Sequence, residues 1–317
     1  MKKRTKTKAY LRRRMMVFLI LAGILVIVSL IAPLICPNDP NATSATAMNQ
    51  APSAQFPFGT DRYGRCVCSR VLMGARTSIF SGVALVGITF IVGTALGLLA
   101  GWYGGIVDTL VMRLADVMLA FPQMVIAIAV AGILGGGMGN AMLAMGITGW
   151  TLYARLARAQ VLAMKEDSYV HAARLTGCSG WTIMVKTLLP NLLGPMLVTA
   201  ATQIGVMMIG IAGLSFLGIG VSEPQAEWGS MINGSRAYLQ LAPWAVLAPA
   251  IATIITVMIF NYLGDCVRDA LDVGEPRAAG GGSSKAKLTA AAPSAGRGAK
   301  DRPANGKSGK VTGEVGR

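Results

Sequence analysis

The sequence predicts an all-α polytopic membrane protein with six transmembrane helices, and three observations lead to this fold class. Hydrophobic residues make up 53% of the 317-residue chain, charged residues make up 14%, and the mean hydropathy is +0.56. Soluble domains carry about 25% charged residues, so this chain has too few to cover a water-facing globule. The chain also contains six apolar runs, each close to the roughly 20 residues that a helix needs to span a bilayer.

The first run, residues 15–35, has no charged residue and would form a helix about 31 Å long. Lys/Arg clusters precede it, but it is longer than the core of a signal peptide and no Ala-x-Ala cleavage site follows. We therefore interpret it as an uncleaved helix. The remaining runs, which complete six crossings, are residues 77–101, 115–134, 140–160, 196–219 and 244–264.

The net charge of +15 is concentrated at the two ends of the chain. Residues 1–14 hold eight Lys/Arg and no acid, and residues 274–317 hold nine Lys/Arg and three acids. Basic flanks stay in the cytoplasm by the positive-inside rule, so both termini are predicted to be cytoplasmic. Since the body between them is nearly neutral, the pattern excludes a nucleic-acid-binding fold, which carries its basic charge on the folded core.

These patterns divide the chain into five segments. They are a basic cytoplasmic N-terminus (1–14), a first transmembrane helix (15–35), an extracytoplasmic loop (36–76), a five-helix core (77–273) with a cytoplasmic loop at 165–191, and a basic cytoplasmic tail (274–317). The loop at 36–76 is itself basic and disagrees with the charge rule. The tail is rich in Gly, Ala, Ser and Lys, which predicts disorder, and a solvated tail is favoured over one that binds lipid headgroups.

The sequence offers no catalytic constellation. A zinc site, a Ser-His-Asp triad or a Cys-His dyad would need His171, the chain's one histidine, which lies in the predicted cytoplasmic loop. No Gly-x-x-x-x-Gly-Lys-Ser/Thr run occurs, so the chain itself does not bind ATP in the usual way. The five cysteines match no disulfide or metal spacing and are interpreted as apolar fillers. We expect no catalytic residue, no metal site and no bound cofactor.

Small and polar residues inside the apolar runs predict how the helices pack. Four glycines at strict four-residue spacing, Gly93, Gly97, Gly101 and Gly105, form one helical stripe that favours close helix contact. Met138, Met142 and Met145 share one face, for which core packing is the expectation rather than a metal site. The candidate polar residues of a translocation pathway are Gln123, Gln203, Ser215 and Asn261. Hydrogen bonds between helices are the alternative interpretation of these four.

The loop at 165–191 is the most informative segment. Ser168 is expected to cap a short helix that Gly177 ends, and residues 181–189 are expected to form a second short helix that Pro190 stops. The pair would protrude from the bilayer, and Ala172 and Ala173 would keep one side of it small. Such a projection suits the cleft of a partner protein. An ordinary structured loop is the alternative.

This loop resembles the coupling loop of permease subunits of binding-protein-dependent ABC importers. Their pattern is Glu-Ala-Ala, three residues, Gly, nine residues, Ile-x-Leu-Pro. The residues that match in register are Ala172, Ala173, Gly177, Leu189 and Pro190. His171 replaces the glutamate and Thr187 the isoleucine. A glutamate three residues after a Ser168 cap would close a capping box, which His171 cannot do in the same way.

Other stretches resemble the dipeptide/oligopeptide/nickel branch of these permeases, and the resemblance covers about residues 12–273. They are Gly59–Arg65 with Ser69-Arg70 and Gly74–Arg76, Leu214–Gly220, Glu227–Gly229, Phe260-Asn261 with Gly264-Asp265, and Arg268–Asp272. Cys66 stands where the branch usually has aspartate.

The resemblance implies the fold of a type I ABC importer permease, in the inner membrane, and an ATP-driven importer of small peptides or of nickel and its chelates. The implied partners are a second homologous permease subunit, two cytoplasmic ATPases that hold ATP and Mg, an extracytoplasmic binding protein and the lipid bilayer. Residues 167–180 would be the coupling helix. The residues that would carry the coupling are Ser168, His171, Ala172, Ala173, Gly177, Leu189 and Pro190.

Other functions stay open at this point. Within the family, the chain could be the permease of a dedicated nickel importer. Outside it, a membrane scaffold or a channel without an ATPase partner would show the same apolar runs. A membrane-embedded enzyme is disfavoured, because His171 lies outside the apolar runs and these runs contain no paired acids.

Overall fold

The computed structural model describes residues 2–272, and for residues 2–9, 11, 12 and 270–272 only the backbone. This part of the chain consists of helices and loops without a strand, as predicted from the apolar runs. The tail at 274–317, for which disorder is predicted, lies outside the described residues.

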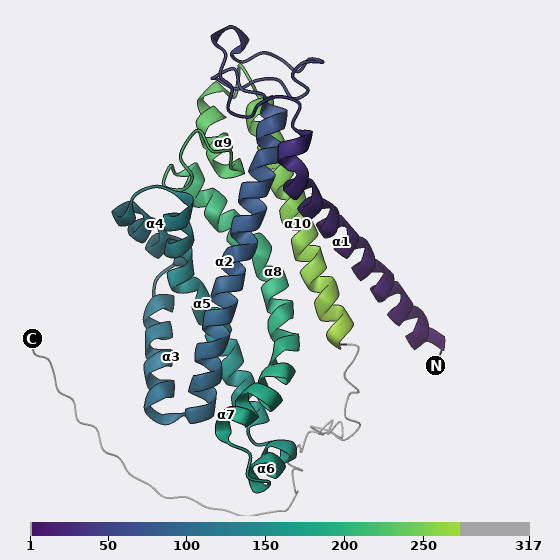
Figure 1. Cartoon of the computed structure of the whole chain (residues 1–317), viewed down its shortest axis with the longest axis vertical. Coiled ribbons are helices and arrows are strands. Elements are labelled where there is room, and N and C mark those ends of the chain that lie inside the picture. Colours follow the sequence, from purple (N-terminus) through teal and green to yellow (C-terminus); the bar gives the residue numbers. More distant parts are fainter. Residues whose placement is uncertain (1, 273–317) are drawn as a thin grey trace, which may run out of the picture. The chain divides into compact units, whose positions relative to one another are not determined.

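The described residues form ten α-helices and three short turns of other helical types (Figure 1). The α-helices are α1 (Lys2–Ile35), α2 (Val67–Tyr103), α3 (Gly105–Leu119), α4 (Gln123–Leu134), α5 (Met138–Met164), α6 (Ser168–Leu175), α7 (Gly180–Ile183), α8 (Leu189–Phe216), α9 (Trp228–Ser235) and α10 (Trp244–Asp272). The turns are η1 (Ala45–Ala47), the π-helical η2 (Met184–Leu188) and η3 (Arg236–Tyr238). Figure 1 shows α9 and the loop after α1 at one end of the bundle, called the α9 end below, and α6 at the opposite α6 end.

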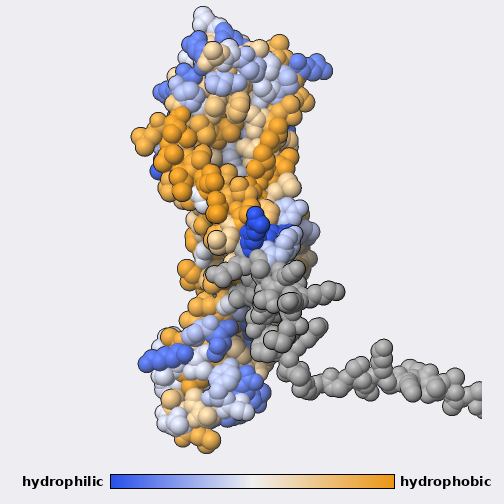
Figure 2. All heavy atoms as spheres, turned by 90° about the vertical axis from the view of Figure 1, so that its right-hand side faces the viewer, coloured by the Kyte–Doolittle hydropathy of each residue, from blue (hydrophilic) through white to orange (hydrophobic). Residues whose placement is uncertain are grey.

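Within the described residues, four helices are long and apolar enough to cross a membrane. They are Arg13–Ile35, Val67–Tyr103, Gly180–Phe216 and Trp244–Asp269, and counting α3 and α4 together as one bent span gives five. On the face in Figure 2, a broad apolar band separates more polar ends. The chain is thus a multi-pass membrane protein, but the predicted number of six crossings is not confirmed, because α5, which carries the fourth run, is not among these helices.

The third predicted run, 115–134, is divided between α3 and α4, which meet at an angle of 88°. Pro122 occupies the N-cap position of α4 with an extended ψ of 128°. Because proline lacks an N–H and disfavours the α conformation in the residue before it, α3 cannot continue through this point. The third run is therefore broken before Pro122 rather than forming one straight helix. Ion pairs of α5 with α3, Arg158 with Asp108 and Arg155 with Asp116, hold α3 alongside α5.

The prediction that Pro190 stops a short helix is wrong. α7, η2 and α8 form one continuous helix from Gly180 to Phe216. In η2 the hydrogen bonds shift register, and the N–H of Leu189 donates to the carbonyl of Met184, five residues back. Pro190 directly follows this π-helical turn, whose shifted register accommodates its missing N–H.

Three of the four stripe glycines let α2 pack along α5. A Cβ at Gly93 or Gly97 would lie 2.3 Å from a main-chain oxygen of α5, and one at Gly101 would lie 2.8 Å from the Cβ of Val161. The fourth, Gly105, begins α3 and has no atom near its Cβ position, so its predicted place in the stripe is wrong. The reason is that α2 ends at Tyr103, two residues before Gly105.

The apolar core lies between α2, α4, α5 and α8. Its largest cluster includes Leu85, Met145, Ile211 and Leu214, and these residues are almost fully buried. The core role predicted for Met145 is confirmed, whereas Met138 and Met142 are only partly buried at the edge of this cluster. α10 packs along α8, and α1 packs on α10 and α2 at the outside of the bundle.

Candidate functional site

The segment at the α6 end, residues 165–183, forms a helical hairpin that we call the α6–α7 hairpin. α6 begins at Ser168, and the cap position before it is Asp167, whose side chain makes no cap hydrogen bond. The predicted Ser168 cap is therefore wrong by one residue. Gly177 ends the helix as predicted, with a φ of +78°. The N–H of Gly177 donates to Arg174 O (3.0 Å) and that of Cys178 to Ala173 O (3.1 Å), which are the two bonds of a Schellman motif.

The α6–α7 hairpin is fastened to the end of α2 through Trp102. Lys165 Nζ donates to the carbonyl oxygen of Trp102 (2.7 Å), and the Arg174 guanidinium lies 4.9 Å from the centroid of the Trp102 ring. Gly180 packs on the same ring, since a Cβ there would lie 3.0 Å from the indole nitrogen. Val170 is fully buried among side chains of α2, α5 and η2. These contacts make the hairpin a rigid extension of the bundle.

The hairpin exposes several apolar side chains among its polar ones at the α6 end. Leu175 is 89% exposed and Trp181 65% exposed, and Tyr169 and Ala172 are exposed beside them. Ala173 is half-buried and packs against the cluster around Val170. Exposed apolar side chains gathered at the polar end of a membrane protein are typical of a contact surface for another protein.

The two departures from the coupling pattern have small structural consequences. His171 is half-exposed, and its Nε2 lies 3.9 Å from a carboxylate oxygen of Glu166, a contact that is ionic only when the imidazole is protonated. Thr187 lies in η2, where its carbonyl accepts a hydrogen bond from Asn191 Nδ2 (2.8 Å). Leu189 is partly buried and Pro190 exposed at the start of α8. The hairpin keeps its fold without the family glutamate.

A second candidate site lies at the α9 end, where the Gly59–Arg65 segment folds onto the loop before α9. Gly59 and Gly64 have φ values of +69° and +74°, and a Cβ at Gly64 would lie 2.0 Å from the carbonyl oxygen of Ser44. Only glycine fits these positions. The turn between them brings the Asp61 carboxylate onto the N–H groups of Tyr63 (2.9 Å) and Arg65 (3.0 Å).

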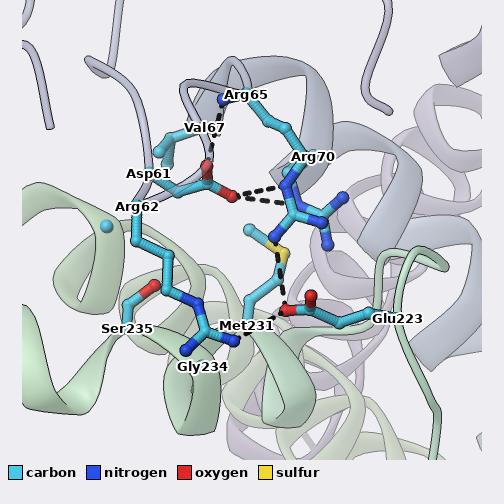
Figure 3. Close-up of a pocket in the computed structure, with 10 residues that line it drawn as sticks. Asp61, Arg62, Arg65, Val67, Arg70, Glu223, Met231, Gly234 and Ser235 are labelled. Carbon is cyan, nitrogen blue, oxygen red and sulfur yellow. Dashed lines mark hydrogen bonds and ion pairs between the residues drawn. The ribbon is translucent and has the colours of Figure 1, made fainter. Parts of the chain in front are cut away.

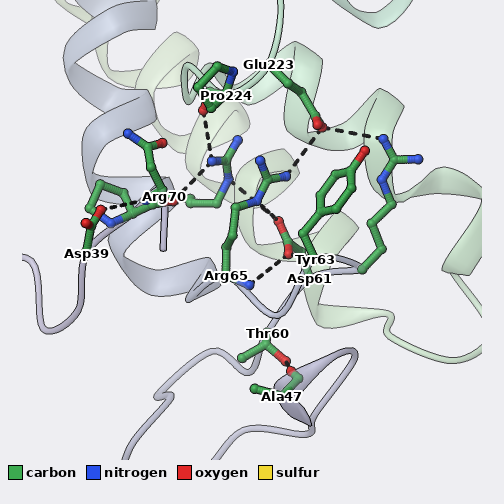
Figure 4. Close-up of polar contacts among 12 residues, drawn as sticks. Asp39, Ala47, Thr60, Asp61, Tyr63, Arg65, Arg70, Glu223 and Pro224 are labelled. Atoms are coloured by element: carbon green, nitrogen blue, oxygen red, sulfur yellow. Dashed lines mark hydrogen bonds and ion pairs between the residues drawn. The ribbon is translucent and has the colours of Figure 1, made fainter. Parts of the chain in front are cut away.

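Three arginines converge on Asp61 and Glu223 (Figure 3). Arg65 Nε lies 2.7 Å from Asp61 Oδ2, and its other arm lies 3.3 Å from Glu223 Oε1. Arg62 also reaches Glu223, at 3.5 Å. Arg70 is buried at the start of α2, 3.8 Å from Asp61, and donates to the carbonyls of Pro40 and Pro224, both at 3.1 Å (Figure 4).

This ion cluster joins three separate parts of the sequence. Burial alone would raise the pKa of Glu223, but the positive charges of Arg65 and Arg62 outweigh it, and the net effect lowers the pKa below its usual value. The space among these side chains, about 10 Å³, holds no more than a water molecule. The cluster therefore fastens the outer loops together and is too tightly filled to bind a solute.

The Glu227-Trp-Gly229 motif anchors α9 to α2. The fully buried Glu227 carboxylate accepts hydrogen bonds from the N–H of Gly229 (2.9 Å), the N–H of Ser230 (2.8 Å) and the hydroxyl of Ser78 on α2 (3.3 Å). Burial raises the pKa of Glu227 despite these donors. Trp228 donates its indole N–H to the carbonyl of Val71 (3.0 Å).

The four predicted pathway residues lie on three helices, α4, α8 and α10. Ser215 is buried, and its hydroxyl accepts the N–H of Val221 (3.3 Å) in the turn after α8. Gln123 on α4 and Gln203 on α8 each have a buried side-chain atom without a hydrogen-bond partner among the described residues. Asn261 is exposed on α10, and its side chain packs against Gly205 of α8, where an added Cβ would lie 2.6 Å from Asn261 Oδ1. Ser215 hydrogen-bonds to the turn after α8, and a pathway role of all four residues stays a prediction.

Sequence reasoning did not single out Asp61, Arg65 or Glu223 as partners. Arg65 and Glu223 are 158 positions apart in the sequence, so spacing offers no signal for their pairing. A local signal did exist, because charged residues between two glycines in an otherwise apolar chain point to a turn with buried ion pairs.

Comparison with known proteins identifies the family. Residues 93–274 match the model described as "Binding-protein-dependent transport system inner membrane component". The dipeptide transport system permease protein DppC of Alkalihalophilus pseudofirmus is 39% identical over 80% of this chain and 84% of its own length. The glutathione transport system permease protein GsiD of Pectobacterium atrosepticum is 42% identical over 71% of this chain and 75% of its own.

A further relative and a solved structure are also similar to this chain. The probable D,D-dipeptide transport system permease protein DdpC of Escherichia coli is 39% identical over 81% of this chain and 85% of its own length. A chain of the inward-facing MetNI methionine ABC transporter aligns at 17% identity with a TM-score of 0.49, over 64% of this chain and 95% of that one, a likeness too low for comparing sites. The named relatives are permease proteins, so the chain is a membrane subunit of a transporter rather than an enzyme. It belongs to the family of inner membrane components of binding-protein-dependent transport systems.

Proposed function

We propose that this chain is the permease subunit of an ATP-driven, binding-protein-dependent importer of small peptides. The relatives named above support peptides, since their names specify dipeptides, D,D-dipeptides and glutathione. The experiment below addresses two alternatives. One is nickel or a nickel chelate as the substrate, and the other is a scaffold or channel without an ATPase. The proposed partners are a second permease subunit, two ATPases and a solute-binding protein.

The observation that carries the proposal is the α6–α7 hairpin with its exposed apolar tip. α5 enters the hairpin, and α7 continues without a break through η2 into α8. A partner that pushes on the hairpin therefore moves the long helix behind it, and Trp102 transmits the same displacement to α2. Bistable packing of helices converts such a local push into a change of access. In this arrangement the α6 end and both termini are cytoplasmic, and the α9 end faces the binding protein.

The coupling residues then have distinct tasks. The exposed Ala172, with Leu175 and Trp181 beside it, meets the ATPase, while Ala173 and Gly177 give α6 its packing and its end. The π-helical turn η2 separates the hairpin from the membrane part of α8, at the kind of irregularity that often marks a functional site in a helix.

The experiment replaces the apolar tip while leaving the buried side of the hairpin intact. In the double variant Leu175→Ser/Trp181→Ser, the ATPase subunits should no longer co-purify with the permease, and ATP-dependent peptide uptake into cells should fall at least about tenfold. The matched control is Thr176→Ser, at an exposed neighbour where the substitution removes one methyl group and keeps the hydroxyl. Unchanged uptake with unchanged ATPase association would contradict the proposed docking surface. Uptake of nickel instead of peptides by the wild-type complex would contradict the substrate class.

A further inference from the structure

A cavity of about 580 Å³ opens at the α9 end, separate from the ion cluster. It lies between the second to fifth turns of α2, the first turns of α5 and the loops at residues 40–41 and 225–226. Its size falls in the range of small-molecule sites, about 300–1,000 Å³. Neither the proposed coupling mechanism nor the ion cluster uses it.

The cavity carries a single positive charge. Of its lining residues only Arg76 is charged, and no acidic residue lines it. Arg76 is exposed and makes no ion pair or hydrogen bond among the described residues, whereas Arg62, Arg65 and Arg70 are all paired. A charged side chain on a membrane helix usually faces a water-filled cavity or a partner group. Arg76 therefore presents a guanidinium that is free to bind an anion.

The remaining walls suit a peptide. Asn41 and Gln225 offer amide groups, and the hydroxyls of Thr77 and Ser81 donate to backbone carbonyls of α2 (3.4 and 3.1 Å), so that their oxygens remain acceptors. Apolar contact comes from Phe80 and from flexible methionines, Met73, Met138 and Met142. Methionine-rich walls adapt to ligands of different shape, as a carrier of varied side chains requires.

We propose that this cavity is a subsite in which Arg76 binds the free carboxylate of a short peptide as it passes the permease. The inference rests on the proposed function and narrows its substrate class to peptides with a free C-terminal carboxylate. A guanidinium binds a carboxylate through two parallel hydrogen bonds, a geometry that the single ammonium of lysine does not reproduce. Loss of a charge-assisted hydrogen bond of this kind weakens binding about tenfold or more.

The first test measures uptake by the complete importer in proteoliposomes, with the binding protein in excess and dialanine as the probe. In Arg76→Gln, dialanine uptake should fall about tenfold through a higher KM, while the assembly and its basal ATP hydrolysis stay unchanged. Arg76→Lys should recover part of the loss. Arg236→Gln is the matched control, because Arg236 is exposed at the same end but stacks over Phe216 (5.4 Å) outside the cavity.

The second test measures ligand binding in the cavity without the binding protein. Ala84 is exposed and lines the cavity, so a cysteine in Ala84→Cys reports occupancy through its rate of labelling by a thiol reagent, measured above the native cysteines. Dialanine should slow this labelling at about tenfold lower concentration than dialanine amide, and Arg76→Gln should remove the difference.

Equal protection by the acid and the amide, or wild-type uptake by Arg76→Gln, would overturn the inference. So would loss of the second permease subunit from the purified Arg76→Gln complex, since Arg76 would then pair with an acid across the subunit interface. These results differ from failure of the proposed function itself, in which the wild-type importer would take up no peptide. In that case the labelling comparison still decides whether the cavity binds a carboxylate.

Discussion

At the scale of single residues, the charges at the α9 end decide how the outer loops are held. Asp61 is buried and accepts two backbone N–H groups and the side chain of Arg65. Buried ion pairs stabilise a fold modestly as units, but removing one partner leaves an uncompensated buried charge. Without Asp61, the charges left buried would be those of Arg65 and Arg70, whose side chains are almost fully buried.

Asp61→Asn should therefore destabilise the α9 end by about 3–5 kcal/mol, because the buried Arg65 loses the nearer of its two charged partners. The measurement is the thermal unfolding midpoint of the detergent-purified complex. The matched control is Asp39→Asn, at an exposed carboxylate that accepts only the nearby N–H of Asn41 (2.8 Å). Equal midpoints for Asp61→Asn and Asp39→Asn would contradict the account of the cluster.

Glu223 should make the same loops sensitive to acid. Because Arg65 and Arg62 lower its pKa below the usual value of 4.5, the folded state favours the charged form. Its contribution to stability is thus present above about pH 4.5 and is lost as pH falls through the lower folded pKa. Proteolysis of the loop at 36–66 should accelerate over this range. Glu223→Gln should abolish the pH dependence, and persistence of the same acid step in that variant would show that another group causes it.

At the scale of elements, helix positions follow from the apolar runs, but their breaks do not. The runs at 15–35 and 244–264 lie in α1 and α10, and each helix continues through an internal proline, Pro33 and Pro249. Pro122 and Pro190 both lie in segments predicted to be helical, but they affect the helix differently. At Pro122 the helix ends, and the axes of α3 and α4 meet at 88°. At Pro190 the helix continues, because a π-helical turn with the buried Met184 and Leu188 precedes the proline.

The α2–α5 contact gives the sharpest prediction at this scale. In Gly97→Val, the new side chain would meet a main-chain oxygen of Ala154 at 2.3 Å, so the two helices must separate at an expected cost of about 1–3 kcal/mol. Gly87→Val on the same helix is the control, since nothing lies within 4 Å of its Cβ position. The readout is the yield and melting temperature of the purified complex. Similar values for both variants would argue against close packing through the stripe.

At the scale of the whole molecule, the apolar composition predicted the membrane fold and the coupling pattern predicted the α6–α7 hairpin. The contacts that place the hairpin were beyond prediction, because Trp102 meets Arg174 and Gly180 only after α2, α5 and α8 are packed. The Arg76 cavity was missed for a similar reason, since its walls come from four separate segments. Residue spacing shows which side chains share a face of one helix, but it does not show which distant segments pack against that face.

We propose that this chain transmits ATPase closure to its membrane helices through the α6–α7 hairpin. Ala173→Asp tests it most directly, because Ala173 packs against the apolar cluster that joins the hairpin to α2 and η2, and a carboxylate there disrupts that joint. The measurement compares ATP hydrolysis and peptide uptake in proteoliposomes, with the exposed Thr176→Asp as control. The account predicts hydrolysis within about twofold of wild type and uptake at least about tenfold lower, a free-energy change of about 1.4 kcal/mol. Normal uptake by stably inserted Ala173→Asp would contradict it.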